Sequence, residues 1–133
     1  MTDFSLAALT VLDLAPPEMI EVAARCGYDA VGLRLLPATP DGIAYRLMDD
    51  EPLFRETLRR MQATGMSVAD LEVVAFRPDT DVAAFTPFFE AGARLGAKHI
   101  LVAAYDPDLT RFEDRYRQFC DAAAKHGLTA DLE

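Results

Sequence analysis

The fold is decided by three consecutive segments: "MSVADLEVVAF" (66–76), "DVAAFTPFFEAGARLG" (81–96) and "AKHILVAAY" (97–105). The first and third segments have strand-like patterns, and the segment between them is helix-like. Gly96 stands where a residue in the left-handed conformation commonly ends a helix. A strand, a helix and a second strand in this order predict two parallel strands joined by a right-handed crossover.

The same strand–helix unit occurs four times along the chain. The strand-like segments are 4–14, 28–36, 66–76 and 97–105, and the helix-like segments are 16–27, 50–65, 81–96 and 108–127. A fifth strand-like segment, 128–133, has no helix after it. The helices end at Gly27, Gly65, Gly96 and Gly127, at intervals of 38, 31 and 31 residues. These intervals are close to the roughly 30 residues of one strand–helix crossover unit.

Strict alternation places the chain in the α/β class, either as an open doubly wound sheet or as a closed (β/α)8 barrel. The turn after the first strand, "LDLAPPE" (12–18), lacks the glycines that let a phosphate approach in a doubly wound nucleotide-binding fold. The barrel is therefore favoured. A complete barrel has eight strands in typically about 250 residues. Residues 1–133 are predicted to form one partial domain, (βα)4 plus a fifth parallel strand, which is a half or truncated TIM (β/α)8 barrel.

Composition limits the partners. With 22 acidic and 13 basic residues the net charge is −9, which disfavours nucleic acids and anionic membranes. No apolar run approaches the roughly 20 residues of a membrane span, and the first residues do not resemble a signal peptide. Cys26 and Cys120 are expected to be reduced packing residues. A cytoplasmic protein is the expectation.

Barrel enzymes have their active sites at the C-terminal ends of the strands, and inward positions alternate along each strand. In segment 28–36 the less apolar phase is predicted to point inward, with Arg34 at the mouth. In segment 66–76 the inward phase is predicted to hold Asp70, Glu72 and Val74. Arg34 and Glu72 either bind substrate or form a structural ion pair with each other.

Three further residues lie at the same end of the strands. Arg77 follows the third strand and could reach anions from its loop. Asp106 follows the fourth strand and is a substrate-binding candidate, although an Asp-Pro turn explains it as well. Glu133 ends the fifth strand in the inward phase with Thr129 and Asp131, where its carboxylate could bind a divalent metal ion.

The segments "EAGARLGAKHILV" (90–102) and "GLTADLE" (127–133) resemble the xylose-isomerase-like TIM barrels of the sugar phosphate isomerase/epimerase family. Segment 90–102 is similar to the family's passage from the third helix to the fourth strand. Segment 127–133 is similar to its fifth strand, which ends in a metal-binding glutamate. The resemblance covers the whole chain but only the N-terminal half of such a barrel. Related barrels include dehydratases.

The resemblance implies a site for Mn, Mg, Co or Zn in the complete barrel, with Glu133 as one ligand. It also implies that Glu133 is one of two glutamates that exchange a proton at the carbon next to a ketose carbonyl. The implied substrate is a sugar or polyol. The isolated chain is expected to be inactive, because the other ligands have no counterpart in it. Two alternatives stay open: a structural half-barrel that forms a homo-oligomer through its open sheet edges, and a small-molecule binding module without catalysis.

Overall fold

The computed structural model describes residues 1–133 and contains one sheet of five parallel strands in the order β1-β2-β3-β4-β5. The strands are β1 (Ser5–Leu6), β2 (Ala30–Arg34), β3 (Ser67–Phe76), β4 (His99–Ala104) and β5 (Thr129–Leu132). The α-helices are α1 (Pro16–Arg25), α2 (Glu51–Thr64), α3 (Thr86–Leu95) and α4 (Leu109–Ala124). Short 3₁₀ helices are η1 (Ala8–Val11), η2 (Leu47–Asp49) and η3 (Val82–Phe85).

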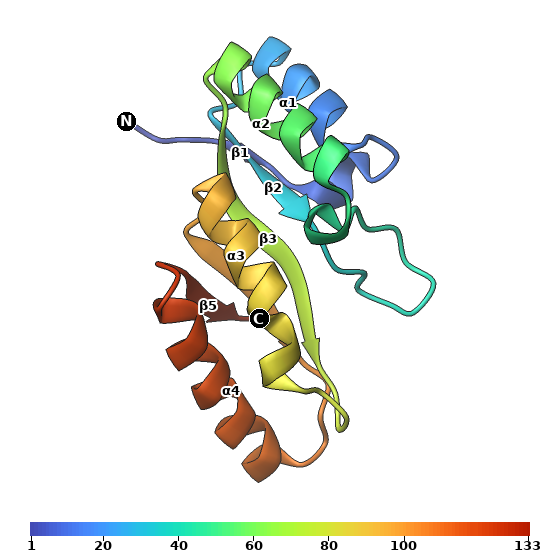
Figure 1. Ribbon diagram of the computed structural model, residues 1–133, viewed down its shortest axis with the longest axis vertical. Helices are drawn as coiled ribbons and strands as arrows, with labels where there is room; N and C mark the ends of the chain where they lie inside the picture. The colour runs from blue at the N-terminus through green and yellow to red at the C-terminus, as the bar shows by residue number, and fades with distance from the viewer.

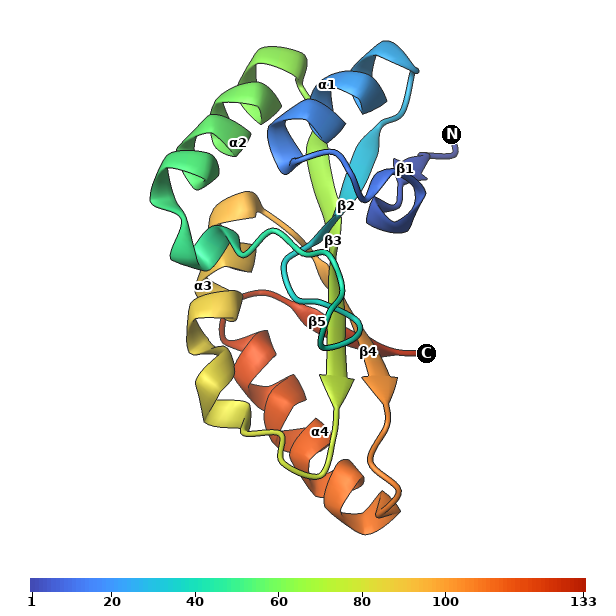
Figure 2. The same ribbon diagram turned by 90° about the vertical axis from the view of Figure 1, so that its right-hand side faces the viewer.

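All four α-helices lie on one face of the sheet, as Figures 1 and 2 show, and the opposite face carries none of them. A doubly wound fold would have helices on both faces and a strand order that reverses. Sequential strand order with helices on one side is the arrangement of a (β/α)8 barrel wall. The prediction of (βα)4 plus a fifth parallel strand is therefore confirmed. The helix-free face, called the inner face below, is the one that a closed barrel encloses.

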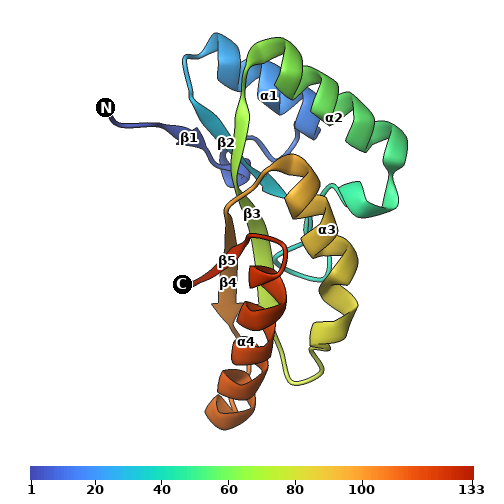
Figure 3. The same cartoon turned by 60° about the vertical axis from the view of Figure 1, so that its left-hand side comes forward.

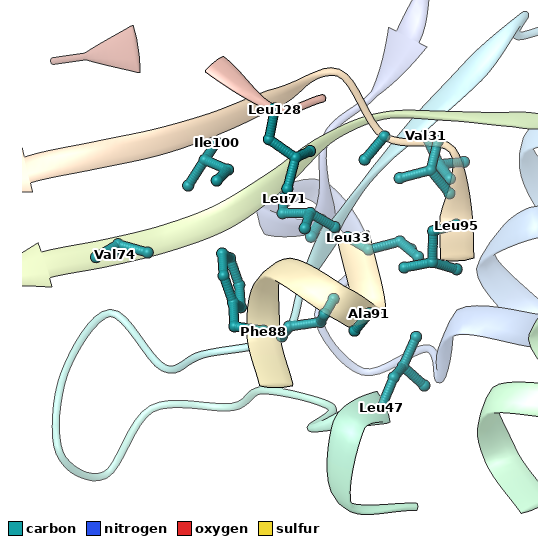
Figure 4. Close-up of a cluster of buried hydrophobic side chains, with 14 of the residues drawn as sticks. Val31, Leu33, Leu47, Leu71, Val74, Phe88, Ala91, Leu95, Ile100 and Leu128 are labelled. Carbon is teal, nitrogen blue, oxygen red and sulfur yellow. The ribbon is translucent and has the colours of Figure 1, made fainter. Parts of the chain in front are cut away.

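The hydrophobic core lies between the sheet and the helices. Leu33, Leu71 and Ile100 point from the strands toward Phe88 and Leu95 of α3, and all five side chains are buried (Figure 4). Phe76 of β3 makes edge-to-face contacts with Phe112 and Phe119, so this strand also packs against α4. Burial of this apolar surface is the main force that fixes the helices on one face.

Helix ends follow the predicted signals. The four glycines predicted to end helices have positive φ, between 69° and 82°. Asp50 and Asp108 cap α2 and α4, because their side chains accept hydrogen bonds from the backbone N–H groups of Leu53 and Arg111. None of the helices combines the length and apolar character that crossing a bilayer requires.

Two details of the strands differ from the prediction. Segment 4–14 was expected to be one strand, but only Ser5–Leu6 pairs with β2, and the chain then turns into η1. In β3, Val74 was predicted to share the inner face with Asp70 and Glu72, and it is instead fully buried among the helices.

β3 contains two register shifts, and the second of them accounts for the position of Val74. Val31 and Gly32 of β2 face Val68 and Asp70, so β3 has one extra residue there. Ile100 and Val102 of β4 are two residues apart, whereas Leu71 and Val74, which they face, are three residues apart. β3 therefore has a second extra residue there. Each extra residue reverses the alternation locally, as a β-bulge does. Strict alternation therefore places Asp70 and Glu72 correctly and fails two residues later.

Candidate functional site

Arg34 and Glu72 form an ion pair at the centre of the inner face. The Nη2 atom of Arg34 lies 2.7 Å from Oε2 of Glu72, and their side chains are 12% and 5% exposed. The other oxygen, Oε1, accepts a hydrogen bond from the backbone N–H of Ala8 in η1. Of the two roles left open by the sequence, the structural pairing is the one observed. The Nε atom of Arg34 is buried and has no hydrogen-bond partner.

Asp70 lies next to this pair, directly over Gly32 of β2. A Cβ atom placed on Gly32 would be 2.4 Å from Oδ1 of Asp70, so the absence of a side chain on β2 makes the space that the carboxyl group occupies. The two residues face each other in the register of β2 and β3. Both residues lie on the inner face, as predicted. The sequence alone does not reveal that Asp70 needs a glycine at position 32 to make room for its carboxyl group.

Polar side chains of β4 and β5 continue the inner face. Nδ1 of His99 lies 2.9 Å from Oδ2 of Asp131 and 3.1 Å from the hydroxyl of Thr129. His99 is the first residue of β4, and the sequence analysis named no contact for it. The signal was the phase of β5, because Thr129 and Asp131 share a side and pair with the strand that His99 begins.

The inner face concentrates negative charge. Burial raises the pKa of Asp70 above its ordinary value, and the charges of Glu72, Asp131 and Glu133 raise it further, while His99 acts in the opposite direction. Carboxylates from β3, from β5 and from the end of β5 therefore all act on Asp70, and the Arg34 guanidinium is paired with Glu72 alone.

Glu133 follows β5 at its C-terminal end. Its backbone N–H donates to the carbonyl of Val102, which holds the residue beside β4, and its side chain is exposed and has no ion-pair partner. No group of three or more His, Cys, Asp or Glu side chains in the chain is arranged to hold a metal ion. Whether Glu133 binds a metal ion therefore stays a prediction.

Arg77 lies just past the end of β3 and is held from several sides. Its guanidinium stacks over the ring of Tyr105 at 5.2 Å, and Nη2 donates to the carbonyl of Ala38 at 3.4 Å. Its backbone N–H donates to the hydroxyl of Thr80. The side chain has no carboxylate partner and reaches from the loop after β2 to the end of β4.

Asp106 is buried, and both of its oxygens accept hydrogen bonds within the protein. Arg111 donates to them from Nε at 2.7 Å and from Nη2 at 2.6 Å, and the N–H of Asp108 donates to Oδ1. The hydrogen bonds from Arg111 hold the pKa of Asp106 below its ordinary value. A direct role of Asp106 in substrate binding stays a prediction. In this structure both of its carboxylate oxygens already accept hydrogen bonds from Arg111.

Comparison with solved structures identifies the arrangement. A xylose isomerase domain protein from Salmonella typhimurium superposes with a TM-score of 0.71 at 14% identity, over 98% of this chain and 48% of that one. An IOLI protein with a zinc atom gives 0.74 at 17%, over 98% and 51%. The 3-keto-D-glucoside 4-epimerase YcjR from E. coli gives 0.73 at 16%, over 99% and 56%. The chain has the fold of the N-terminal half of a xylose isomerase-like TIM barrel.

This half-barrel spans about half the length of the solved structures that it matches. No protein-family model matches its sequence. No curated protein matches it either. At these identities the likeness establishes the fold alone, and function has to be argued from the residues of the inner face.

Proposed function

We propose that the chain is the N-terminal half of a divalent-metal-dependent sugar (phosphate) isomerase or epimerase that moves a proton next to a ketose carbonyl. The observation that carries this proposal is the position of Glu133. It presents a carboxylate without an ion-pair partner at the C-terminal end of β5. Among the matched structures, one holds a zinc atom and another is described as an epimerase.

In this proposal Glu133 has two roles. It contributes one ligand to a divalent ion whose other ligands lie outside this chain, and that ion would polarise a substrate oxygen. Its carboxylate also accepts or returns the proton at the carbon next to the carbonyl, as a general base or acid. The neighbouring Asp70 and Asp131 keep the region negative, which attracts a cation.

Arg34 and Glu72 support the site in a different way. Their side chains are nearly buried, so the pair holds β2 and β3 together on the inner face and offers little surface to a ligand. Arg77, which is exposed and has no carboxylate partner, is the better candidate for direct contact with substrate. The isolated chain is expected to be inactive, because one carboxylate ligand does not retain an ion in a catalytic geometry.

The deciding experiment begins with the coding sequence that follows residue 133. An Asp, a His and a second Glu at later strand ends would complete the site. The full-length protein should then contain close to one equivalent of divalent metal and exchange the hydrogen next to a ketose carbonyl with solvent deuterium. Glu133→Gln should reduce both, and Glu90→Gln on the exposed side of α3 should reduce neither. Exchange by residues 1–133 alone with added Mn²⁺ would contradict the proposal as stated.

Self-association is a second candidate function, and the free edges of the sheet favour it. Strands β1 and β5 each pair on one side only, and Figure 3 shows both chain ends on the inner-face side. Phe4 and Leu132, next to these edges, are 63% and 51% exposed. Against it stands the negative inner face, because two copies would bring Asp70 and Asp131 of each together. Sedimentation at micromolar concentration separates the cases, and a strictly monomeric species excludes self-association.

A further inference from the structure

A hollow of about 290 Å³ opens at the C-terminal ends of β2 and β3. It lies between the loop after β2 and the C-terminal end of β3, because residues of both segments line it. Most of its lining is apolar, and a hydroxyl and a guanidinium stand among these residues. The lining includes Leu36, Pro40, Val73, Phe85, Thr39 and Arg77. This size suits a small organic molecule.

One wall of the hollow is the end of β3, which has a neighbouring strand on one side only. The ladder between β2 and β3 ends at Arg34 and Glu72, while β3 continues to Phe76 with β4 as its only partner. Val73 and Ala75 line the hollow on this stretch. Peptide groups on the side of β3 that faces the hollow have no neighbouring strand, so they remain available to a ligand.

Arg77 supplies the charge at the rim. Most arginines of this acidic chain pair with a carboxylate, and only Arg25, Arg77 and Arg115 lack one within 4.0 Å. The backbone of Arg77 is fixed by Arg115, whose Nη1 donates to the carbonyls of Arg77 and Pro78. Its side chain is fixed by Tyr105 and by the carbonyl of Ala38.

A positioned guanidinium without an acidic partner is suited to bind an anion from solution, because it retains several N–H donors in a planar fork. Holding its side chain in place before binding reduces the entropy that a ligand contact would cost. The same stacking on Tyr105 keeps the group at the edge of an apolar space. The arrangement thus combines one cationic contact with a wall that accepts carbon surface.

We propose that this hollow binds a small organic anion, with the carboxylate or phosphate group on Arg77 and the carbon body against Leu36, Val73 and Phe85. The site belongs to this half of the barrel and does not need a metal ion. Binding of an anion in this hollow does not depend on the proposed function. The inference rests on that function only where it identifies the bound anion as the acidic group of the substrate. An acidic sugar derivative is then the substrate class, in preference to a neutral sugar.

The test measures binding to the chain itself by following amide NMR signals during titration with three probes that share a ring. Phenyl phosphate and benzoate carry the two candidate anions, and benzyl alcohol is neutral. At least one anion should shift the amides of Thr39, Val73 and Arg77 in the millimolar range, and whichever binds more tightly identifies the preferred group. Benzyl alcohol should bind at least several-fold more weakly than that anion.

Variants separate this site from general attraction to positive charge. Arg77→Gln should weaken binding of the preferred anion roughly tenfold or more, as expected for the loss of a charged hydrogen bond. Arg25→Gln removes an exposed arginine that also lacks an ion pair, from α1, and should leave binding unchanged. Equal affinity of the wild type and Arg77→Gln, or of benzyl alcohol and the anions, would overturn the inference. The metal and exchange measurements on Glu133 are independent of that result.

Discussion

Arg34 and Glu72 stand opposite each other in neighbouring parallel strands, and their charged groups meet at 2.7 Å on the inner face of the half-barrel. Oε1 of Glu72 also accepts the N–H of Ala8, so the same carboxylate ties η1 to the sheet. Three separate segments therefore depend on one acidic side chain. A buried pair of this kind tolerates the loss of both charges better than the loss of one.

Removing one charge of this pair should be costly. Glu72→Gln leaves the Arg34 guanidinium nearly buried without a counter-charge, and we expect it to lower the free energy of unfolding by about 3 kcal/mol. Urea denaturation of the variant measures this. Arg34→Met combined with Glu72→Gln should lose less than the sum of the two single changes. The exposed Glu90→Gln on α3 is the control and should be close to neutral. If the loss in the double variant equalled the sum of the losses in the two single variants, the two charges would not be coupled.

The contact between Gly32 and Asp70 gives a second prediction. Gly32→Ala places a methyl group 2.4 Å from Oδ1 of Asp70, so the carboxyl group has to move, and we expect a loss of roughly 1–3 kcal/mol in the free energy of unfolding. In an Asp70→Ala background the same change should cost much less, because the clashing atoms are gone. A double-mutant cycle by urea denaturation decides between this contact and a general intolerance of β2 to side chains.

Much of this architecture could be predicted from the sequence because its signals are local. Each glycine that ends a helix acts on neighbouring residues, so the spacing of the four glycines reveals the repeating unit. The alternation in β2 and β5 likewise placed Arg34 and Asp131 on the inner face. Val74 was misplaced because the register shift between Leu71 and Val74 depends on how β3 pairs with β4. The fixed position of Arg77 depends on Tyr105 and on the carbonyl of Ala38, which are distant in sequence and which no local pattern links to it.

Asp70 should make the fold less stable as the solution becomes neutral. Burial, followed by the charge of Glu72, raises its pKa in the native state, so the folded chain holds this proton more tightly than the unfolded chain does. The resulting stability is present at acid pH and is lost as the pH rises through the native pKa. Asp70→Asn removes the ionised form, and we expect it to raise Tm by a few degrees at pH 7.

The sign of this effect is checked by repeating the melts at lower pH. The gain from Asp70→Asn should shrink towards pH 3, where the wild-type carboxyl group is already protonated. Asp41→Asn, in the exposed loop after β2, changes the net charge by the same amount and should give little gain at either pH. A gain of equal size for both variants would attribute the effect to net charge alone.

Asp106 should show the opposite pH dependence. Hydrogen bonds from Arg111, with a further one from the N–H of Asp108, lower its native pKa, so the folded chain holds this proton less tightly than the unfolded chain. Its stabilising contribution is present above the ordinary pKa near 3.8 and is lost as the pH falls through the lower native value. Asp106→Asn should therefore lower Tm at pH 7 and flatten the decline of Tm below about pH 4. Asp114→Asn, exposed on α4, is the matched control and should keep the wild-type acid limb. An unchanged acid limb in Asp106→Asn would mean that the pair with Arg111 does not persist in solution, and the buried oxygens of Asp106 would then be free to bind substrate.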